Sequence, residues 1–247
     1  MSTHLIIGDA HDQPEISKAR FLALGKLIAD VKPDVVVCLG DFASMDSLSS
    51  YDKGKKSHEG KRYAKDVASA NTALDLIHQG MGVYTKKVRK IITWGNHEDR
   101  IDRAVNSNAE LDGSMSKDDI QFKQRGWETY EFLDMVPVEE VYYSHYFASG
   151  VMQRPIGGES PAASMLKKHY VSCVAGHSHL YDYAERTRAD KRKINGLVAG
   201  CYYTHSMSYA KASEHMFWSG ITILNDVNKG DYDLTRISTK RIMKAYN

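Results

Sequence analysis

The stretch HLIIGDAHDQPEISKARFLALGKLIADVKPDVVVCLGD, residues 4–41, decides the fold. It opens with a short apolar run that stops at a polar turn. Over 16–29 apolar residues recur at spacings of three and four, which predicts a helix with one apolar side formed by Phe21, Leu24, Leu27 and Ile28. After Pro33 a continuous run of β-branched residues predicts a strand buried on both faces. Strand, helix and strand with short connections predict a βαβ unit, and therefore an α/β fold.

The rhythm of strands and helices continues along the chain. The pattern predicts helices over 63–80, roughly 98–133 and 160–170, and strands over 88–94, 138–145 and 171–176. The last 50 residues alternate with turns, as in an all-β sheet. No Pro/Gly/Ser-rich linker divides the chain, so we expect a single domain over 1–247. The polar segment 46–62 is too long for an ordinary connection, and we expect it to be a surface insertion.

Composition excludes some classes of protein. The chain of 247 residues is 42% hydrophobic, which suffices for a sizeable core, and its net charge of +2 gives no global attraction to nucleic acid or to membranes. No apolar stretch approaches the roughly 18–20 residues of a membrane span, and the N-terminus does not resemble a signal peptide. The three cysteines include no CxxC pair. We therefore expect a reduced, cytoplasmic setting and no membrane partner.

Polar side chains follow five of the predicted strands, at the point where each strand ends. These side chains are Asp9 and His11, Asp41, Asn96 and His97, His145, and His177 and His179. In open α/β sheets ligands bind at the carboxyl ends of strands, so these side chains should meet in one crevice. Two of the motifs place candidate ligands two residues apart, which in an extended chain directs both side chains to the same side.

Two aspartates, one asparagine and four imidazoles form a metal-binding inventory without thiolate. Such mixed oxygen and nitrogen ligands suit Mn, Fe, Zn, Ni or Co. Seven ligands are too many for a single catalytic zinc, which usually has three from the protein. They suit two divalent ions with one shared carboxylate, an arrangement that clamps a phosphoryl group for in-line attack.

The order of these motifs resembles the calcineurin-like metallophosphoesterase superfamily. D-x-H at 9–11, G-D at 40–41, G-N-H-E at 95–98, a single histidine at 145 and G-H-x-H at 176–179 occur in the same succession as in that family. Each block alone is weak, whereas the whole series at strand ends is a strong signal. It leaves the last 68 residues uncovered, where only the β-rich character fits.

The resemblance implies a β-sandwich flanked by helices and a dimetal site at the carboxyl ends of the strands. It implies that Asp9, His11 and His179 bind one ion, that Asn96, His145 and His177 bind the second, and that Asp41 bridges them. A hydroxide between two ions, manganese first among the candidates, would be the nucleophile. His97 resembles the histidine of the family that is not a ligand, and it would donate to phosphoryl oxygens or protonate the leaving group.

Simpler interpretations exist for single residues. Asp9, Asp41 and Asn96 could cap turns after strands, although four histidines in the same order argue against that. The assignment of His145 as a ligand rests on that single residue, because no local motif surrounds it. Arg154 could bind a phosphate through both arms of its guanidinium or be an ordinary surface arginine. We expect Glu98 and Arg100 to be structural charges, and we do not expect the following histidines to be ligands: His4, His58, His78, His169, His205 and His215.

The substrate is less constrained than the chemistry. In the Ser/Thr phosphatases of the superfamily the bridging aspartate precedes an Asp-Arg-Gly motif, whereas here Asp41 precedes FASMDS. The core is closer to phosphodiesterases and to Mre11/SbcD-type nucleases of compact phage or bacterial layout. We therefore expect a phosphodiesterase or nuclease, with nucleic acid as a partner through the basic segment 46–62. The alternatives are a phosphomonoesterase for small metabolites or nucleotides, and a non-catalytic metal-bound scaffold.

Overall fold

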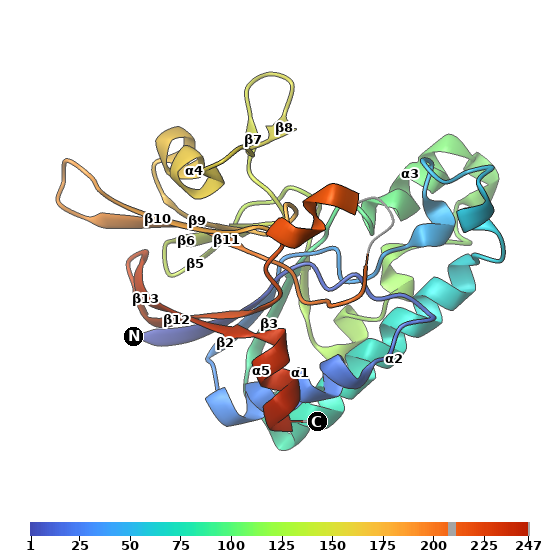
Figure 1. The fold of residues 1–247 in the computed structure, drawn as a ribbon, viewed down its shortest axis with the longest axis horizontal. Coiled ribbons are helices and arrows are strands. Elements are labelled where there is room, and N and C mark those ends of the chain that lie inside the picture. The colour runs from blue at the N-terminus through green and yellow to red at the C-terminus, as the bar shows by residue number, and fades with distance from the viewer. Residues whose placement is uncertain (207–210, 247) are drawn as a thin grey trace.

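Two mixed β-sheets pack face to face between helices in the computed structural model, which describes residues 1–206 and 211–246 (Figure 1). The first sheet has the order β13-β12-β1-β2-β3-β4. Its strands are β1 (Ser2–Ile7), β2 (Val35–Cys38), β3 (Arg89–Thr93), β4 (Glu128–Tyr130), β12 (Gly220–Asn228) and β13 (Asp231–Ser238). Strands β1 to β4 are parallel, and β12 and β13 extend the sheet antiparallel beyond β1.

The second sheet has the order β10-β11-β9-β6-β5. Its strands are β5 (Val136–Val138), β6 (Val141–Ser144), β9 (Ser172–Ala175), β10 (Tyr181–Thr187) and β11 (Lys193–Ala199). The central strands β6, β9 and β11 are parallel, and the two edge strands are antiparallel. A small hairpin of β7 (Ala148–Ser149) and β8 (Arg154–Pro155) projects from the body of the molecule (Figure 1).

Helices cover the outer faces of both sheets. Against the first sheet pack α1 (Ala19–Val31), α2 (Tyr63–Met81) and α5 (Thr239–Tyr246), and against the second packs α4 (Pro161–His169). Helix α3 (Asp99–Ser107) follows β3. Short 3-10 turns are η1 (Asp46–Leu48), η2 (Lys56–His58), η3 (Gly82–Lys86), η4 (Ala109–Leu111), η5 (Lys117–Asp119), η6 (Lys123–Arg125) and η7 (Lys211–Met216). Among the described residues, no helix is both long enough and apolar enough to cross a bilayer.

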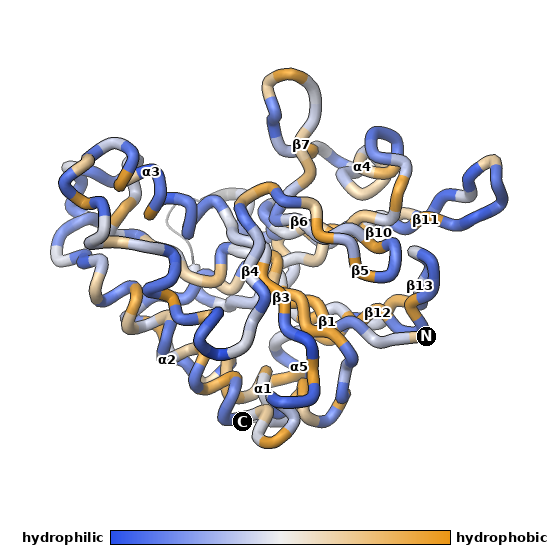
Figure 2. Tube along the Cα trace, turned by 180° about the vertical axis from the view of Figure 1, so that it is seen from behind, coloured by the Kyte–Doolittle hydropathy of each residue, from blue (hydrophilic) through white to orange (hydrophobic). Residues whose placement is uncertain are grey.

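Alternation along the strands divides the core into layers. In β1 the side chain of Ile6 lies between the two sheets, whereas Leu5 and Ile7 face the helices. Strand β2 repeats this alternation, since Val37 lies between the sheets and Val36 faces the helices. The hydrophobic residues therefore concentrate along the central strands, and the loops are polar (Figure 2). This arrangement confirms the α/β fold with two sheets flanked by helices.

Two predicted elements are wrong in extent. The helix expected over 98–133 ends at Ser107, and the rest of that segment forms 3-10 turns and β4. Here Gly113 and Gly126 take positive φ angles of 75° and 76°, which a helix cannot accommodate. The strand expected over 138–145 is a hairpin, because Glu139 and Glu140 turn the chain with φ angles of 50° and 63°.

The C-terminal region is β-rich as expected over β11, β12 and β13, but it also ends in a helix. Helix α5 was not predicted, because its eight residues follow directly from the alternating pattern of β13. It places Ile242 in the same hydrophobic cluster as α1 and α2. The sheet and the helical layer beside it are therefore completed by the last residues of the chain.

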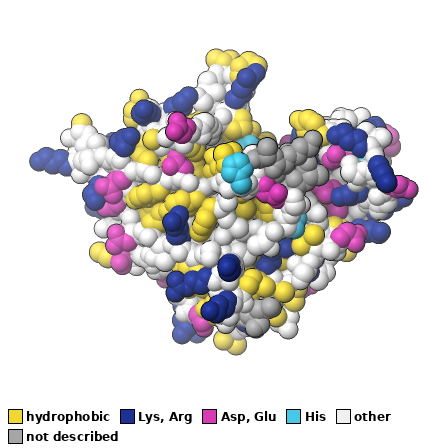
Figure 3. All heavy atoms as spheres, viewed as in Figure 1, with side chains coloured by type: hydrophobic (Ala, Val, Ile, Leu, Met, Phe, Trp, Pro, Cys, Tyr) yellow, Lys and Arg dark blue, Asp and Glu magenta, His cyan; other side chains and the backbone are white. Residues whose placement is uncertain are grey.

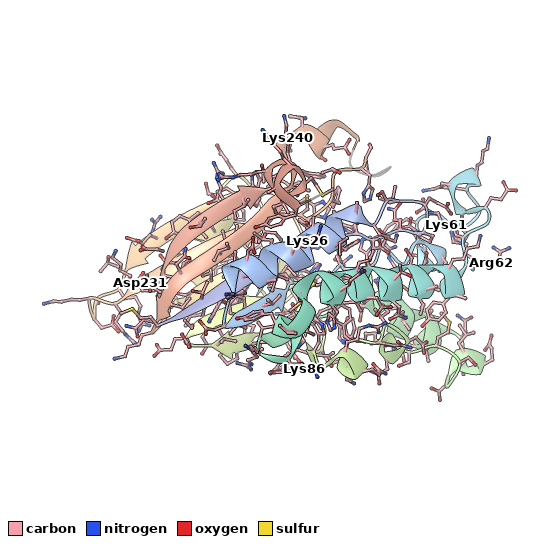
Figure 4. All side chains as sticks on the ribbon, turned by 90° about the horizontal axis from the view of Figure 1, so that it is seen from below. Lys26, Lys61, Arg62, Lys86, Asp231 and Lys240 are labelled. Atoms are coloured by element: carbon pink, nitrogen blue, oxygen red, sulfur yellow. The ribbon has the colours of Figure 1, made fainter. Side chains whose placement is uncertain are left out.

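The polar segment 46–62 extends from the carboxyl end of β2 and is exposed over most of its length. Its base is fixed, because the Ser47 amide donates to Asp66 Oδ2 at 3.0 Å and Lys61 Nζ lies 2.5 Å from Asp46 Oδ2. Figure 4 shows Lys61 and Arg62 at the opposite end of the molecule from Asp231. On the face seen in Figure 3, basic and acidic side chains are intermixed over most of the surface.

Candidate metal centre

The carboxyl ends of five parallel strands from both sheets meet at one edge of the sandwich. They bring together all eight residues that the strand-end motifs singled out: Asp9 and His11 after β1, Asp41 after β2, Asn96 and His97 after β3, His145 after β6, and His177 and His179 after β9. Most of these side chains are buried, whereas Asn96 and His177 are partly exposed. The partly exposed pair marks the side of the cluster that faces solvent.

The first group of candidate ligands consists of Asp9, His11 and His179. The Nε2 atom of His179 lies 3.0 Å from Asp9 Oδ2 and 3.1 Å from His11 Nε2. Asp9 Oδ2 is buried, and despite its closeness to His179 Nε2 it receives no well-aligned hydrogen bond from the described part of the chain. A buried carboxylate oxygen is costly to leave unsatisfied, and a cation held by all three atoms would remove that cost.

The second group consists of Asn96, His145 and His177, with Asp41 alongside. Asn96 Oδ1 lies 2.8 Å from His145 Nε2 and 2.9 Å from His177 Nδ1. His145 Nδ1 lies 2.8 Å from the Leu39 carbonyl oxygen, which can only accept, so Nδ1 carries the hydrogen and Nε2 presents a lone pair. Two acceptor atoms, Asn96 Oδ1 and His145 Nε2, therefore face each other at 2.8 Å, as ligand atoms do around a metal ion.

Asp41 lies between the two groups. Its Oδ2 atom is 3.8 Å from His11 Nε2 on one side and 3.5 Å from His145 Nε2 on the other. The other oxygen, Oδ1, accepts the backbone N–H of His97 at 2.8 Å, which fixes the orientation of the carboxylate. A single oxygen atom thus faces both groups, which is the geometry that a bridging carboxylate requires.

Electrostatics in this cluster favour divalent cations. Burial, together with the charge of Asp9, raises the pKa of Asp41 well above its ordinary value. Burial also acts to raise the pKa of Asp9, but the contact with His179, together with His145 and the His177 amide, outweighs burial and lowers that pKa. Burial lowers the pKa of His177 to about 4, so its imidazole is neutral near pH 7 and can bind metal. Positive charge between the two carboxylates would hold both ionised.

The backbone around the cluster is shaped for these side chains. His11, Asp41, His177 and His179 all have positive φ angles, between 43° and 66°, which non-glycine residues seldom adopt. Glycine leaves the space for both carboxylates, since a Cβ on Gly95 would meet Asp41 Oδ1 at 2.1 Å and one on Gly176 would meet Asp9 Oδ1 at 2.3 Å. Unfavourable conformations gathered at one site are typical of functional centres.

His97 stands beside the two groups. Its Nδ1 lies 2.7 Å from the Ser44 carbonyl oxygen and therefore carries the hydrogen, while Nε2 lies 3.8 Å from Asp41 Oδ2. His97 could by distance join His11 and Asp41 in a third ligand group. However, Nη2 of Arg100 lies 3.3 Å from Nε2, and a guanidinium in that place opposes a metal ion on the same nitrogen. The geometry thus favours a role for His97 other than metal binding.

The sequence matches a known protein family over most of its length. The family model described as calcineurin-like phosphoesterase matches residues 3–209. The chain belongs to the calcineurin-like phosphoesterase family. A search of curated proteins gave no match. One solved structure aligns with this chain at 10% sequence identity and a TM-score of 0.40. The alignment covers 96% of this chain and 99% of the other chain, and a likeness this low carries no functional information.

Membership of the calcineurin-like phosphoesterases, together with the buried His and Asp groups, makes the chain a metal-dependent phosphoesterase. The donor set fits such an enzyme, because it offers carboxylate, amide and imidazole atoms and places an unsatisfied carboxylate oxygen among them. The three cysteines, Cys38, Cys173 and Cys201, are buried and form no disulfide.

Left-handed turns, and not the extended chain expected from the sequence, direct the paired ligands of this phosphoesterase. Asp9 and His11 do converge, but through a left-handed turn at His11 and not through an extended chain. His177 and His179 are each left-handed, and they separate, with His177 in the second group and His179 in the first. The turns that follow the strands therefore aim these side chains, and the twofold period of a strand does not.

Sequence reasoning missed Tyr203, which follows the carboxyl end of β11. Its hydroxyl lies 2.9 Å from His179 Nδ1, which leaves Nε2 directed at Asp9. The strand-end rule that found the other residues could have found it.

Arg154, by contrast, is exposed in the β7–β8 hairpin. Glu98 has the structural role expected, since its carboxylate accepts the amides of Gly95, Asp41 and Ala43 at 2.8–3.0 Å.

Proposed function

We propose that this chain is a phosphodiesterase that depends on two divalent ions. The observation that carries the proposal is Asp41 Oδ2, which faces an imidazole nitrogen of each ligand group at 3.8 and 3.5 Å. Asp9, His11 and His179 would hold one ion, Asn96, His145 and His177 the other, and Asp41 both. Manganese suits this set of oxygen and nitrogen donors best, with iron, zinc, nickel and cobalt as alternatives.

Bound divalent ions would polarise the phosphoryl oxygens and lower the pKa of a water molecule that attacks phosphorus. The residues of the chain orient the reaction. The His97 amide fixes Asp41, and the Leu39 carbonyl fixes the ring of His145. Asn96 and His177, on the solvent side, define the direction from which the phosphoester approaches.

His97 is assigned to the leaving group. Its Nδ1–H is held by the Ser44 carbonyl, so Nε2 is the atom that faces substrate. Nε2 accepts a hydrogen bond in the free protein and must gain a proton before it can protonate a leaving oxygen. An anionic phosphoryl group beside His97 favours that protonation, because an opposite charge stabilises the imidazolium.

A diester is favoured over a monoester by the charge near the cluster. A phosphate monoester is a dianion near pH 7, whereas a diester carries a single negative charge. Two guanidinium groups lie at the cluster, those of Arg100 and Arg103. Each has a carboxylate within 4 Å, that of Asp46 for Arg100 and that of Asp99 for Arg103. This modest positive charge suits a monoanion. A phosphomonoesterase for metabolites or nucleotides is the alternative, and a non-catalytic scaffold is disfavoured by family and site.

Hydrolysis of paired aryl esters tests the proposed function. With manganese supplied, kcat/KM for bis(p-nitrophenyl) phosphate is expected to exceed that for p-nitrophenyl phosphate by about tenfold or more, a difference of about 1.4 kcal/mol in barrier. Both esters release the same phenol, so the comparison isolates the charge at phosphorus. A preference for the monoester would favour the phosphomonoesterase instead.

A nuclease is the narrower form of this proposal, and the segment 46–62 is its support. The segment leaves the strand that precedes Asp41, and it contains five basic and three acidic residues. Asp46 lies near Lys61 and Asp52 near Lys55. Lys53 and Lys56 are exposed and make no ion pair within the described part of the chain. An extended phosphodiester that passes the cluster could contact these side chains.

Replacing Lys53, Lys55 and Lys56 with Ala is expected to raise KM for single-stranded oligonucleotides by roughly threefold or more. The slope of log KM against log salt should become shallower by up to about 2, because each phosphate contact on a single strand releases roughly 0.7 counterion. Turnover of bis(p-nitrophenyl) phosphate should stay unchanged. The matched control replaces Lys86, Lys87 and Lys240, which lie outside the segment. Equal kinetics of both triple variants on oligonucleotides would remove the nucleic-acid interpretation and favour a small substrate.

A further inference from the structure

The side chain of Arg100 reaches the candidate centre from the first turn of α3. It follows His97 by three residues, a spacing that places both on one face of a helical turn. The Arg100 side chain is 14% exposed, and Nη1 donates to the Ser44 carbonyl oxygen at 2.9 Å and lies 3.3 Å from the Met45 carbonyl oxygen. One arm of the guanidinium is thereby anchored on the backbone that follows Asp41.

The other arm points to the atom of His97 that faces the cluster. His97 Nδ1 donates to the same Ser44 carbonyl, so Nε2 is an acceptor, and Arg100 Nη2 lies 3.3 Å from it. Nε2 is in turn 3.8 Å from Asp41 Oδ2. A positively charged donor therefore lies at the edge of the two ligand groups. Only the ring of His97 separates it from Asp41, the proposed bridging carboxylate.

A neutral imidazole is a weaker partner for a guanidinium than an anionic oxygen. Charge-assisted hydrogen bonds to phosphate are shorter and roughly twice as strong as neutral ones, and the planar guanidinium matches the spacing of phosphate oxygens. A phosphoryl group that reaches the ions and His97 would come within reach of Nη2. Anchoring of Nη1 restricts the guanidinium before substrate arrives, which reduces the ordering entropy lost on binding.

We propose that Arg100 binds a non-bridging phosphoryl oxygen of the substrate, exchanging His97 Nε2 for that oxygen when the phosphoester binds. The ligand is an anionic phosphoryl group, and the inference rests on the proposed phosphoesterase site. The exchange also frees His97 Nε2 for the leaving group. Arg100 thus has a substrate-binding role and is more than the structural charge that the sequence suggested.

Binding of inorganic phosphate to the manganese-loaded protein tests the assignment without turnover. Arg100→Gln is expected to weaken phosphate affinity by roughly tenfold or more, measured by calorimetry, because a charge-assisted hydrogen bond is lost. Arg100→Lys, which keeps the charge but loses the fork, should fall between Arg100→Gln and wild type. The control Arg89→Gln removes an exposed arginine paired with Glu128 at the amino end of β3 and should bind phosphate as wild type does.

Kinetics, metal content and melting temperature separate this role from a structural one. Arg100→Gln is expected to have a higher KM for the diester and to retain its manganese content. If Arg100→Gln and Arg100→Lys bind phosphate with wild-type affinity per metal-loaded chain, Arg100 does not contact substrate and the inference is wrong. The same holds if Arg100→Lys loses its metals and phosphate affinity in equal proportion. Wild-type protein that binds phosphate but hydrolyses no phosphoester would instead contradict the proposed function.

Discussion

Replacing Asp41 with Asn is expected to reduce metal content from two ions per chain to less than one. Asp41 Oδ1 accepts the His97 amide at 2.8 Å, so the remaining oxygen of asparagine stays on that amide. The new NH₂ group then occupies the place of Oδ2, which faces both ligand groups. A donor group in that place cannot bind a cation, so one substitution removes a ligand from both sites.

The loss of activity in Asp41→Asn should be at least about 10³-fold, because metal chemistry contributes several kcal/mol and each 1.36 kcal/mol is tenfold in rate. Metal content by inductively coupled plasma mass spectrometry and kcat/KM on the diester are the measurements. Asp75→Asn is the matched control, since Asp75 is exposed on α2 and pairs with Arg125. Two ions retained in Asp41→Asn would show that this carboxylate does not bridge.

His97→Ala is expected to keep both ions and to lose turnover by roughly 10²-fold or more, as removal of a general acid implies. The loss should be larger for a diester with a poor leaving group, such as an alkyl ester, than for a nitrophenyl ester. The reason is that a poor leaving oxygen needs a proton from Nε2, whereas nitrophenolate departs without one. Rates on both esters, with metal content measured on the same samples, check this prediction.

Two other histidine variants separate metal binding from the role of His97. His177→Ala should lose metal, because Nδ1 lies 2.9 Å from Asn96 Oδ1 within the second group. His215→Ala is the control, because His215 is exposed in η7 and outside the ligand groups. Near-normal hydrolysis of the alkyl diester by His97→Ala would mean that His97 does not serve the leaving group.

Much of the fold was predictable because buried parallel strands have a strong pattern. Runs such as Val35 to Cys38 lie between two hydrophobic layers, so nearly every residue is apolar, and a polar residue marks where the strand ends. The same pattern located the candidate site, since parallel strands put their carboxyl ends on one edge. Asp9, Asp41 and Asn96 are close in space for this reason.

Elements controlled by tertiary contacts could not be predicted. The segment after α3 is charged and resembles a helix, yet Ile120, Phe122 and Trp127 are buried against the core, and this packing takes precedence over local propensity. The turn at Glu139 and Glu140 contains no glycine or asparagine, the residues that would have indicated its positive φ angles. Helix α5 is too short to be recognised without the α1 and α2 side chains that it covers.

Within the site, the sequence indicated which residues gather but not how they are oriented. The left-handed turns at His11, His177 and His179 decide which ligand joins which group, and no local pattern encodes them. Tyr203 and Arg100 contact His179 and His97 through side chains whose directions depend on the packing of neighbouring elements. The contacts of Tyr203 and Arg100 could therefore be identified only from the structure.

The number of metal ions that one chain holds distinguishes a two-ion centre from a one-ion centre. Wild-type protein should be stripped with a chelator, reconstituted with excess manganese, freed of loosely held metal by gel filtration and analysed by inductively coupled plasma mass spectrometry. Two groups of ligands that share Asp41 Oδ2 predict two manganese ions per chain. A single ion per chain, or none, in fully folded and reconstituted protein would contradict the two-ion centre.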